Sequence, residues 1–200
     1  MKSYRSPGDL LAEIEQVLAQ KAPRSSPLEK IVEILYSGRH YFWIGIYLRV
    51  GERIERQAFR GPVSPCESFA FGVGNVGIAG QSGIEKISPD VSADPTYRMC
   101  FRETKSEMVA PIKIAGRTLG VIDAQSERLN AFGPKERILL KETGRRLAKF
   151  LSMKGKYILL KARRIAAEAA PATAPEAIKQ QPVSERVQQL RAAAGDKSRK

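Results

Sequence analysis

The spacing of apolar residues predicts two amphipathic helices in the first forty positions. Between residues 9 and 20 the apolar side chains recur every three or four positions and share one helical face: Leu10, Leu11, Ile14, Val17 and Leu18. A second helix is predicted by "SPLEKIVEILYSG", which has proline at the first helical position and Gly38 at its end. Ser26 and Glu29 have the spacing of a capping box.

From residue 41 onward the apolar period changes to two, the period of a β-strand. A hairpin is predicted by "YFWIGIYL" and "ERIERQAFR" around "RVG". Short strands are expected in "SFAFGVG" and "EKISPD", and a short helix of small residues in "NVGIAGQSG" between them. Two further strands, joined at "AGR", are predicted by "EMVAPIKIAGRTLGVIDAQ".

A long amphipathic helix is predicted by "PKERILLKETGRRLAKFLSMK". Its expected core face consists of Ile138, Leu139, Leu147, Phe150 and Leu151. Helices, several antiparallel strands and a closing helix describe an α+β domain with a central sheet. We place this domain at residues 26–153, after an N-terminal helical segment at residues 1–25.

The remaining segment, residues 154–200, differs in composition from the rest. The chain carries a net charge of +13, and this segment contains eleven Lys and Arg against four Asp and Glu. A Pro/Ala-rich stretch and a polar end give it too few apolar residues for a core of its own. We expect a basic tail, helical or disordered, that makes weak contacts with nucleic acid or anionic surfaces.

The cysteines raise a question of compartment and chemistry. No run of eighteen apolar residues occurs, and the N-terminal apolar stretch is interrupted by acids, so we expect a cytoplasmic protein without membrane insertion. Thiols are normally reduced there. Cys66 and Cys100 are then either a redox pair or two buried small apolar residues, and their number alone does not decide between these hypotheses.

The order of several segments resembles a GAF domain. These segments are "FWIGIYL", a Gly-Pro turn, "FGVGNVGIAG", "SEMVAPI" and "GRTLGVIDAQS", within residues 28 to 152. Within that superfamily they are most similar to the free methionine-(R)-sulfoxide reductases. The resemblance implies a GAF-like antiparallel sheet with flanking N- and C-terminal helices, free methionine sulfoxide as substrate, and a thioredoxin-like dithiol as reductant. It implies no cofactor and no metal, and a possible homodimer formed by the terminal helices.

The resemblance also implies roles for individual residues. Cys100, seven residues before Glu107, matches the catalytic cysteine, and Cys66 in "GPVSPC" matches the resolving one. Trp43 and Tyr47 match the substrate cage, and they share one strand face because they are four residues apart. A core-filling role for Trp43 is the alternative.

Two buried acids are implied by the same resemblance, at Glu107 and Asp123. We expect them to start adjacent strands and to converge on one pocket, where burial raises a carboxyl pKa. A turn residue at a strand end is the alternative for Asp123. Arg98, Arg102 and Lys105 either favour the Cys100 thiolate or point to solvent.

Three departures from the family pattern keep a second function open. Val76 in "GNVG" stands where the family often has a third cysteine, within Gly-Val-Cys-Gly. Gln125 stands where the family has its second pocket aspartate, and "YRMCF" replaces His-Ile-Ala-Cys-Asp. The sequence therefore leaves three hypotheses: a thiol-dependent sulfoxide reductase, a non-catalytic GAF module for small-molecule binding or redox sensing in signalling, or a domain that its basic tail tethers to acidic partners or nucleic acid.

Overall fold

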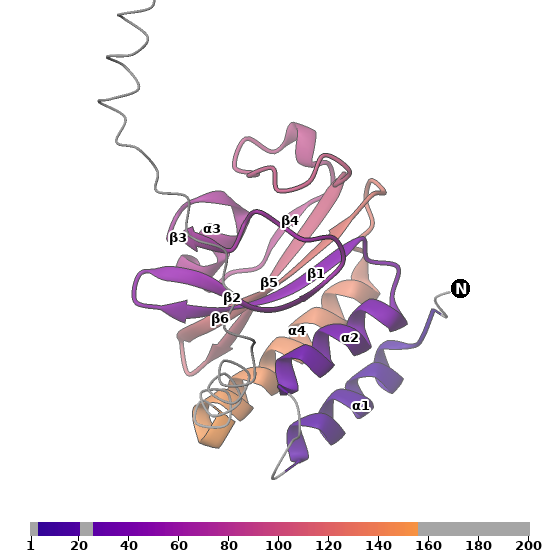
Figure 1. Cartoon of the computed structure of the whole chain (residues 1–200), viewed down its shortest axis with the longest axis vertical. Helices are drawn as coiled ribbons and strands as arrows, with labels where there is room; N and C mark the ends of the chain where they lie inside the picture. The colour runs from indigo at the N-terminus through magenta and orange to yellow at the C-terminus, as the bar shows by residue number, and fades with distance from the viewer. Residues whose placement is uncertain (1–3, 21–25, 156–200) are drawn as a thin grey trace, which may run out of the picture. The chain divides into compact units, whose positions relative to one another are not determined.

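The computed structural model of the 200-residue chain describes residues 4–20 and 26–155 (Figure 1). All but the first two residues of the predicted basic tail lie outside these ranges. The elements follow in the order α1 (Pro7–Ala19), α2 (Pro27–Gly38), β1 (Trp43–Val50), β2 (Arg53–Arg60), β3 (Ser68–Ala70), α3 (Gly74–Ser82), β4 (Lys86–Ser88), η1 (Val91–Ala93), β5 (Ser106–Ile114), β6 (Arg117–Ser126), α4 (Pro134–Phe150) and the one-turn π-helix η2 (Leu151–Gly155).

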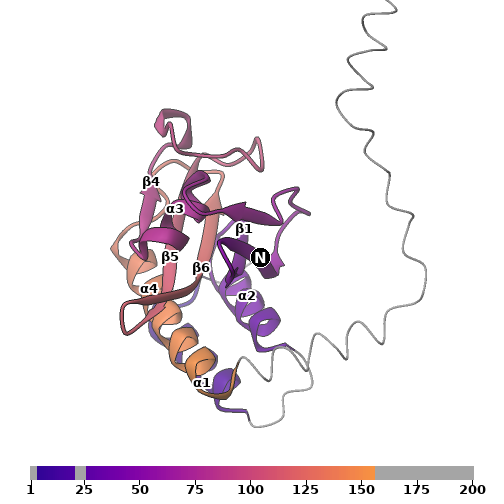
Figure 2. The same ribbon diagram turned by 90° about the vertical axis from the view of Figure 1, so that its left-hand side faces the viewer.

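A six-stranded sheet in the order β3-β2-β1-β6-β5-β4 forms the centre of the domain, and every strand pair is antiparallel. One face of the sheet is covered by α2 and α4, with α1 packed against these two helices, whereas α3 and the long connections lie over the other face (Figures 1 and 2). The expected α+β architecture, with an antiparallel sheet and flanking helices, is confirmed.

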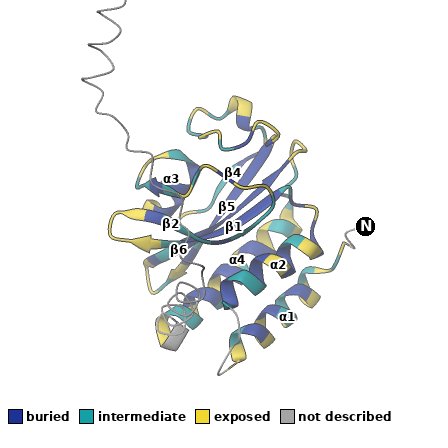
Figure 3. Cartoon of the chain, in the orientation of Figure 1, coloured by how far each residue is buried: buried dark blue, intermediate teal, exposed yellow. Residues whose placement is uncertain are grey.

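Each face of the sheet has its own apolar cluster, and the strands between them are largely buried (Figure 3). The helix-covered face holds the larger cluster, which includes Leu10 and Ile14 of α1 together with Leu139 and Leu147 of α4. The α1 helix thus packs into the same core as the sheet. Among the described residues, no helix is both long and apolar enough to cross a bilayer.

Two local expectations are corrected by the packing of the helices. Ser26 precedes α2, but its side chain makes no capping hydrogen bond. Glu29 instead accepts a hydrogen bond of 2.6 Å from Arg60 Nη1. A salt bridge to a neighbouring strand has therefore replaced the local capping box.

The inward face of α4 also differs from the expectation. Ile138 is 56% exposed, whereas Leu140 is fully buried. Gly144 lies against β5 so closely that an added Cβ would be 2.6 Å from the Pro111 carbonyl oxygen. This contact sets the inward direction of the helix. Ile138, six residues earlier and therefore about 240° around the helix, is turned away from the sheet.

A buried ion pair fastens the start of α4 to the end of α2. Arg39 is 1% exposed, and its Nη2 donates to Glu136 Oε1 and to the hydroxyl of Tyr4. Its Nη1 donates to the Arg5 carbonyl oxygen at 2.9 Å. The same guanidinium therefore holds three segments that are distant in sequence.

We expect Glu136→Gln to lower the free energy of unfolding by about 3 kcal/mol, because it leaves the Arg39 charge buried without its counter-ion. Urea denaturation, followed by circular dichroism, measures this loss. Glu142→Gln is the matched control. Glu142 pairs with two arginines at the surface, so its loss should change stability by less than about 1 kcal/mol. Equal losses in the two variants would contradict the prediction.

Candidate functional site

The antiparallel register brings the predicted site residues together on the sheet face that carries α3. Glu107 of β5 is paired with Gln125 of β6, and Gln125 is paired in turn with Trp43 of β1. Side chains two positions apart share a strand face. Asp123 therefore lies on the same face as Gln125, and Tyr47 on the same face as Trp43. All five side chains are at most 4% exposed.

The position of Asp123 corrects one expectation. Glu107 lies near the start of β5, as predicted, but Asp123 is inside β6, opposite Gly45 and Val109. It is therefore neither the start of its strand nor a turn residue. The two acids meet because the start of one antiparallel strand lies beside the end of the next.

Trp43 and Tyr47 lie next to each other, with ring centroids 6.2 Å apart. Gly45 between them makes room for the indole, since a Cβ there would be 2.2 Å from the Trp43 ring. Two aromatic residues absent from the prediction also lie against the indole: Phe59 stacks on Trp43, and the Phe101 ring centroid is 5.9 Å from that of Trp43. Trp43 thus fills core and lines the site at once.

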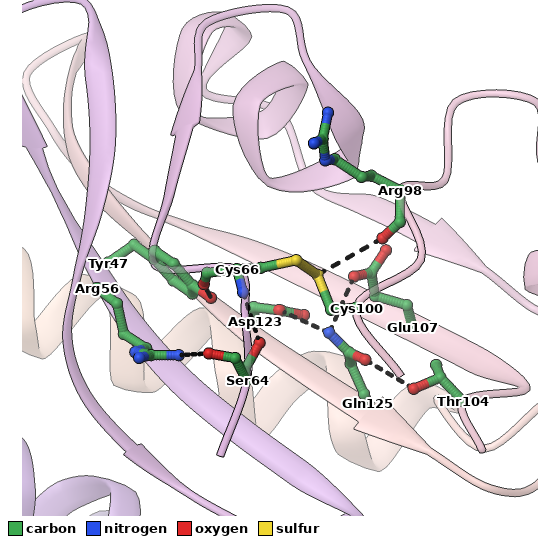
Figure 4. The surroundings of a disulfide bond; sticks show 10 residues. All are labelled: Tyr47, Arg56, Ser64, Cys66, Arg98, Cys100, Thr104, Glu107, Asp123 and Gln125. Atoms are coloured by element: carbon green, nitrogen blue, oxygen red, sulfur yellow. Dashed lines mark hydrogen bonds between the residues drawn. A yellow bond between two sulfur atoms is a disulfide. The ribbon is translucent and has the colours of Figure 1, made fainter. Parts of the chain in front are cut away.

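Cys66 and Cys100 are joined by a disulfide, with Cα atoms 5.9 Å apart (Figure 4). Cys66 lies in the connection between β2 and β3, and Cys100 lies in the connection that leads to β5. Both cysteines pack against the cluster that contains Trp43 and Tyr47. The Tyr47 hydroxyl donates a hydrogen bond of 3.0 Å to the Cys66 carbonyl oxygen. The sulfurs therefore lie at the edge of the aromatic cluster.

The basic residues near Cys100 are exposed. Figure 4 shows the Arg98 guanidinium turned away from the sulfurs; it is the Arg98 carbonyl oxygen that lies 3.6 Å from Cys100 Sγ. Arg102 and Lys105 are also exposed. The arrangement agrees with the alternative that these side chains face solvent.

Glu107, Asp123 and Gln125 lie beside the disulfide (Figure 4). Gln125 Nε2 donates to Asp123 Oδ2 at 3.0 Å and to Glu107 Oε1 at 3.4 Å. Its Oε1 accepts a hydrogen bond of 2.7 Å from the Thr104 hydroxyl. The residue that replaces a third acid therefore supplies a hydrogen-bond donor to the other two.

Burial changes the acidity of this pair. It raises the pKa of Asp123 to about 7, against the hydrogen bonds from Gln125 and Glu107, which lower it. Burial also raises the pKa of Glu107 well above its usual range, and the nearby Asp123 charge raises it further. At neutral pH the pair therefore retains at least one proton.

One functional residue escaped the sequence analysis. Asn75, at the start of α3, is 3% exposed, and its Nδ2 donates to Glu107 Oε2 at 2.6 Å. The only signal in the sequence was a strongly polar side chain near the start of a helix of small, mostly apolar residues. Within the described ranges, no group of His, Cys, Asp and Glu is arranged to hold a metal ion.

Comparisons with known proteins agree with this geometry. No protein-family model matches the chain. GAF domain-containing protein A of Dictyostelium discoideum is 33% identical over 125 residues, which cover 62% of this chain and 78% of that protein. The free methionine-R-sulfoxide reductase of Saccharomyces cerevisiae is 39% identical over 85 residues, which cover 40% of this chain and 47% of that protein.

A solved structure gives the same relationship in three dimensions. The free methionine-R-sulfoxide reductase from Neisseria meningitidis, determined in complex with its substrate, is similar with a TM-score of 0.67 and 27% identity. The similarity covers 82% of this chain and 99% of that one. The chain therefore belongs to the GAF domain family and is related to the free methionine-(R)-sulfoxide reductases.

Proposed function

We propose that this protein reduces the (R)-sulfoxide of free methionine, with Cys100 as the nucleophile and Cys66 as the resolving thiol. The observation that carries the proposal is the disulfide between these two cysteines, which lies beside a buried acid pair. A sulfoxide needs both a nucleophile for its sulfur and a proton for its oxygen. The site holds both kinds of group within one face of the sheet.

In the first step the Cys100 thiolate attacks the sulfoxide sulfur and forms an S–S bond, while the sulfoxide oxygen takes up a proton. The hydroxyl then moves to the Cys100 sulfur as both the S–O bond and the new S–S bond to the substrate break. Methionine is released, reduced by two electrons, and Cys100 is left as a sulfenic acid, oxidised by two. The Glu107–Asp123 pair supplies the proton, because it retains one at neutral pH.

The second step forms the disulfide. The Cys66 thiol attacks Cys100 sulfur, and the hydroxyl leaves as water. A dithiol reductant, such as a thioredoxin-like protein, then attacks the disulfide and returns both cysteines to thiols, while its own pair becomes a disulfide. The structure has the oxidised form of the two cysteines, which is the form that the dithiol reductant would attack.

Substrate binding is assigned to the aromatic pair and to the acids. Trp43 and Tyr47 offer ring faces to the methyl and thioether groups, and carboxylates attract an ammonium group. Gln125 leaves this site with two acids, so we expect weaker attraction for a cation than a third acid would give.

The homodimer, the cytoplasmic location and the weak contacts of the basic tail with nucleic acid or anionic surfaces stay predictions.

A non-catalytic GAF module is the second candidate, and Gln125 favours it. Gln125 donates one hydrogen bond to Asp123 Oδ2 and another to Glu107 Oε1, so a side chain of the protein itself holds the two acids. In that case the disulfide would report the redox state of the surroundings, and the pocket would bind a small molecule without converting it.

Cysteine variants distinguish these functions. We expect Cys100→Ser to abolish methionine formation from methionine-(R)-sulfoxide with dithiothreitol as reductant, because the nucleophile is lost. When no dithiol is added, Cys66→Ser should complete one turnover and stop as a sulfenic acid, which dimedone labels at Cys100. Product is measured by chromatography, and methionine-(S)-sulfoxide is the control substrate. Equal background rates in the wild type and both variants would leave the binding module as the function.

The proton supply is tested by the pH dependence of stability. A carboxyl whose pKa is raised from 3.8 to about 7 on folding takes up protons that the unfolded chain has released. Stability therefore falls as pH rises through that window. We expect Asp123→Asn to remove this dependence, so that its stability relative to the wild type rises by roughly 3 kcal/mol between pH 4 and 7.

Urea denaturation of the oxidised proteins measures that difference, and Asp90→Asn is the control of opposite sign. Hydrogen bonds from Ser92 hold the pKa of the exposed Asp90 carboxyl below its usual value. The wild type should therefore gain stability relative to Asp90→Asn as pH rises. A constant difference between Asp123→Asn and the wild type over pH 4 to 7 would show that Asp123 ionises normally and supplies no proton.

A further inference from the structure

The Asn75 amide has more hydrogen-bond partners than a structural role in a short helix requires. Its Nδ2 lies 2.6 Å from Glu107 Oε2, 3.0 Å from Ser88 Oγ and 3.2 Å from Asp94 Oδ2. Its Oδ1 accepts from the Thr96 hydroxyl at 2.7 Å. Acceptors on one side and a donor on the other fix the amide with its nitrogen toward the acids.

Gln125 makes a similar connection on the other side of the same carboxyl. Its oxygen accepts from Thr104, and its nitrogen reaches Glu107 Oε1. Thr96 and Thr104 lie four residues before and four residues after Cys100. The segment that carries Cys100 is therefore joined at two points to amides, and each amide donates to a different oxygen of Glu107.

Asp94 makes the Asn75 side of this arrangement rigid. Its carboxylate accepts from the Ser88 hydroxyl and, at 2.9 Å, from the backbone N–H of Thr96. The Thr96 hydroxyl lies 2.6 Å from Asp94 Oδ1 and 2.7 Å from Asn75 Oδ1, so these two oxygens share its single proton. Lys86 Nζ lies 3.6 Å away. Burial raises the pKa of Asp94, but these hydrogen bonds outweigh it and hold the pKa below the usual range. Asp94 is therefore a fixed negative charge that orients the Asn75 amide.

We propose that Asn75 is a positioning residue, which holds the Glu107 carboxyl in place and fastens the Cys100 segment to it. A buried amide is costly unless its hydrogen bonds are made, and an apolar side chain would fill the space next to the sheet with less penalty. The contacts of Asn75 lead to the acid pair on one side and to the Cys100 segment on the other. Loss of the Asn75 amide should therefore displace both the Glu107 carboxyl and the Cys100 segment.

The electrostatic surroundings of Glu107 set the expected direction of the pH effect. The titratable groups that face it are Asp123 of β6, Asp94 and Tyr97 of the Cys100 segment, and Tyr47 of β1, while Lys86 of β4 is paired with Asp94. The Asn75 hydrogen bond lowers the pKa of Glu107. Without that donor, the Glu107 carboxyl holds its proton to higher pH.

The experiment compares the full-length wild type with Asn75→Leu, Asn75→Asp and the matched control Ser88→Ala. Ser88 is a partner of the same amide, and its side-chain hydrogen bonds run to Asn75 and Asp94 rather than to Glu107. The pKa of the Glu107 carboxyl is measured by carbon NMR titration of the oxidised proteins. The values of kcat and KM for methionine-(R)-sulfoxide are measured with dithiothreitol.

We expect Asn75→Leu to raise the Glu107 pKa and to lower kcat by about tenfold to a hundredfold, with KM within about threefold, because a displaced acid misses the reacting oxygen. The alkaline limb of the kcat profile should move to higher pH. The kcat of Ser88→Ala should stay within about threefold of the wild-type value. Asn75→Asp keeps the shape but loses the donor, so it should raise the pKa as well and carries the test if Asn75→Leu does not fold.

The inference is overturned if folded Asn75 variants keep the wild-type pKa of Glu107, or if Ser88→Ala causes the same loss as Asn75→Leu. Only the kinetic part rests on the proposed function. If the wild type reduces no sulfoxide, the proposed function fails, and the NMR titration still decides whether Asn75 positions Glu107.

Discussion

The buried contact between Glu107 and Asp123 is the constraint on which the site depends. Two carboxyl groups beneath an apolar layer cannot both ionise without a large penalty, so their environment must supply a proton or donors. The register of β1, β6 and β5 forces this meeting, because it places one acid at the start of β5 and the other near the end of β6. The sheet topology therefore dictates the acidity of the site.

The two amides explain how such a pair is tolerated. Gln125 donates to both acids and Asn75 donates to Glu107, so three of the four carboxyl oxygens accept from a fixed amide, whereas Asp123 Oδ1 accepts from neither amide. A third carboxylate at position 125 would add a like charge, and it would need a donor or proton of its own. The glutamine keeps the hydrogen bonds and removes that charge. The departure from the family pattern is thus consistent with a stable site that still holds a proton.

The sequence predicted the features that follow from the local period of apolar residues. It predicted few of the contacts that depend on how strands and helices pack together. Alternation placed Trp43 and Tyr47 on one strand face, and the order of motifs identified the GAF architecture. Periodicity alone did not show that α4 turns Ile138 outward, because the close contact of Gly144 with β5 decides its direction. Nor did spacing reveal Asn75, whose partners at positions 88, 94 and 107 are brought together only by tertiary packing.

The placement of the thiols and acids on different kinds of element also has a mechanical reason. The acids are held on central strands, where the sheet and its two apolar clusters fix their positions. Cys66 and Cys100 lie on connections outside the strands, where the backbone adjusts more easily. A sulfur that attacks a substrate and later joins a second sulfur must occupy two positions, whereas a proton donor works best in one. The Asn75 and Gln125 amides join the two regions, because each amide contacts Glu107 and a threonine of the Cys100 segment.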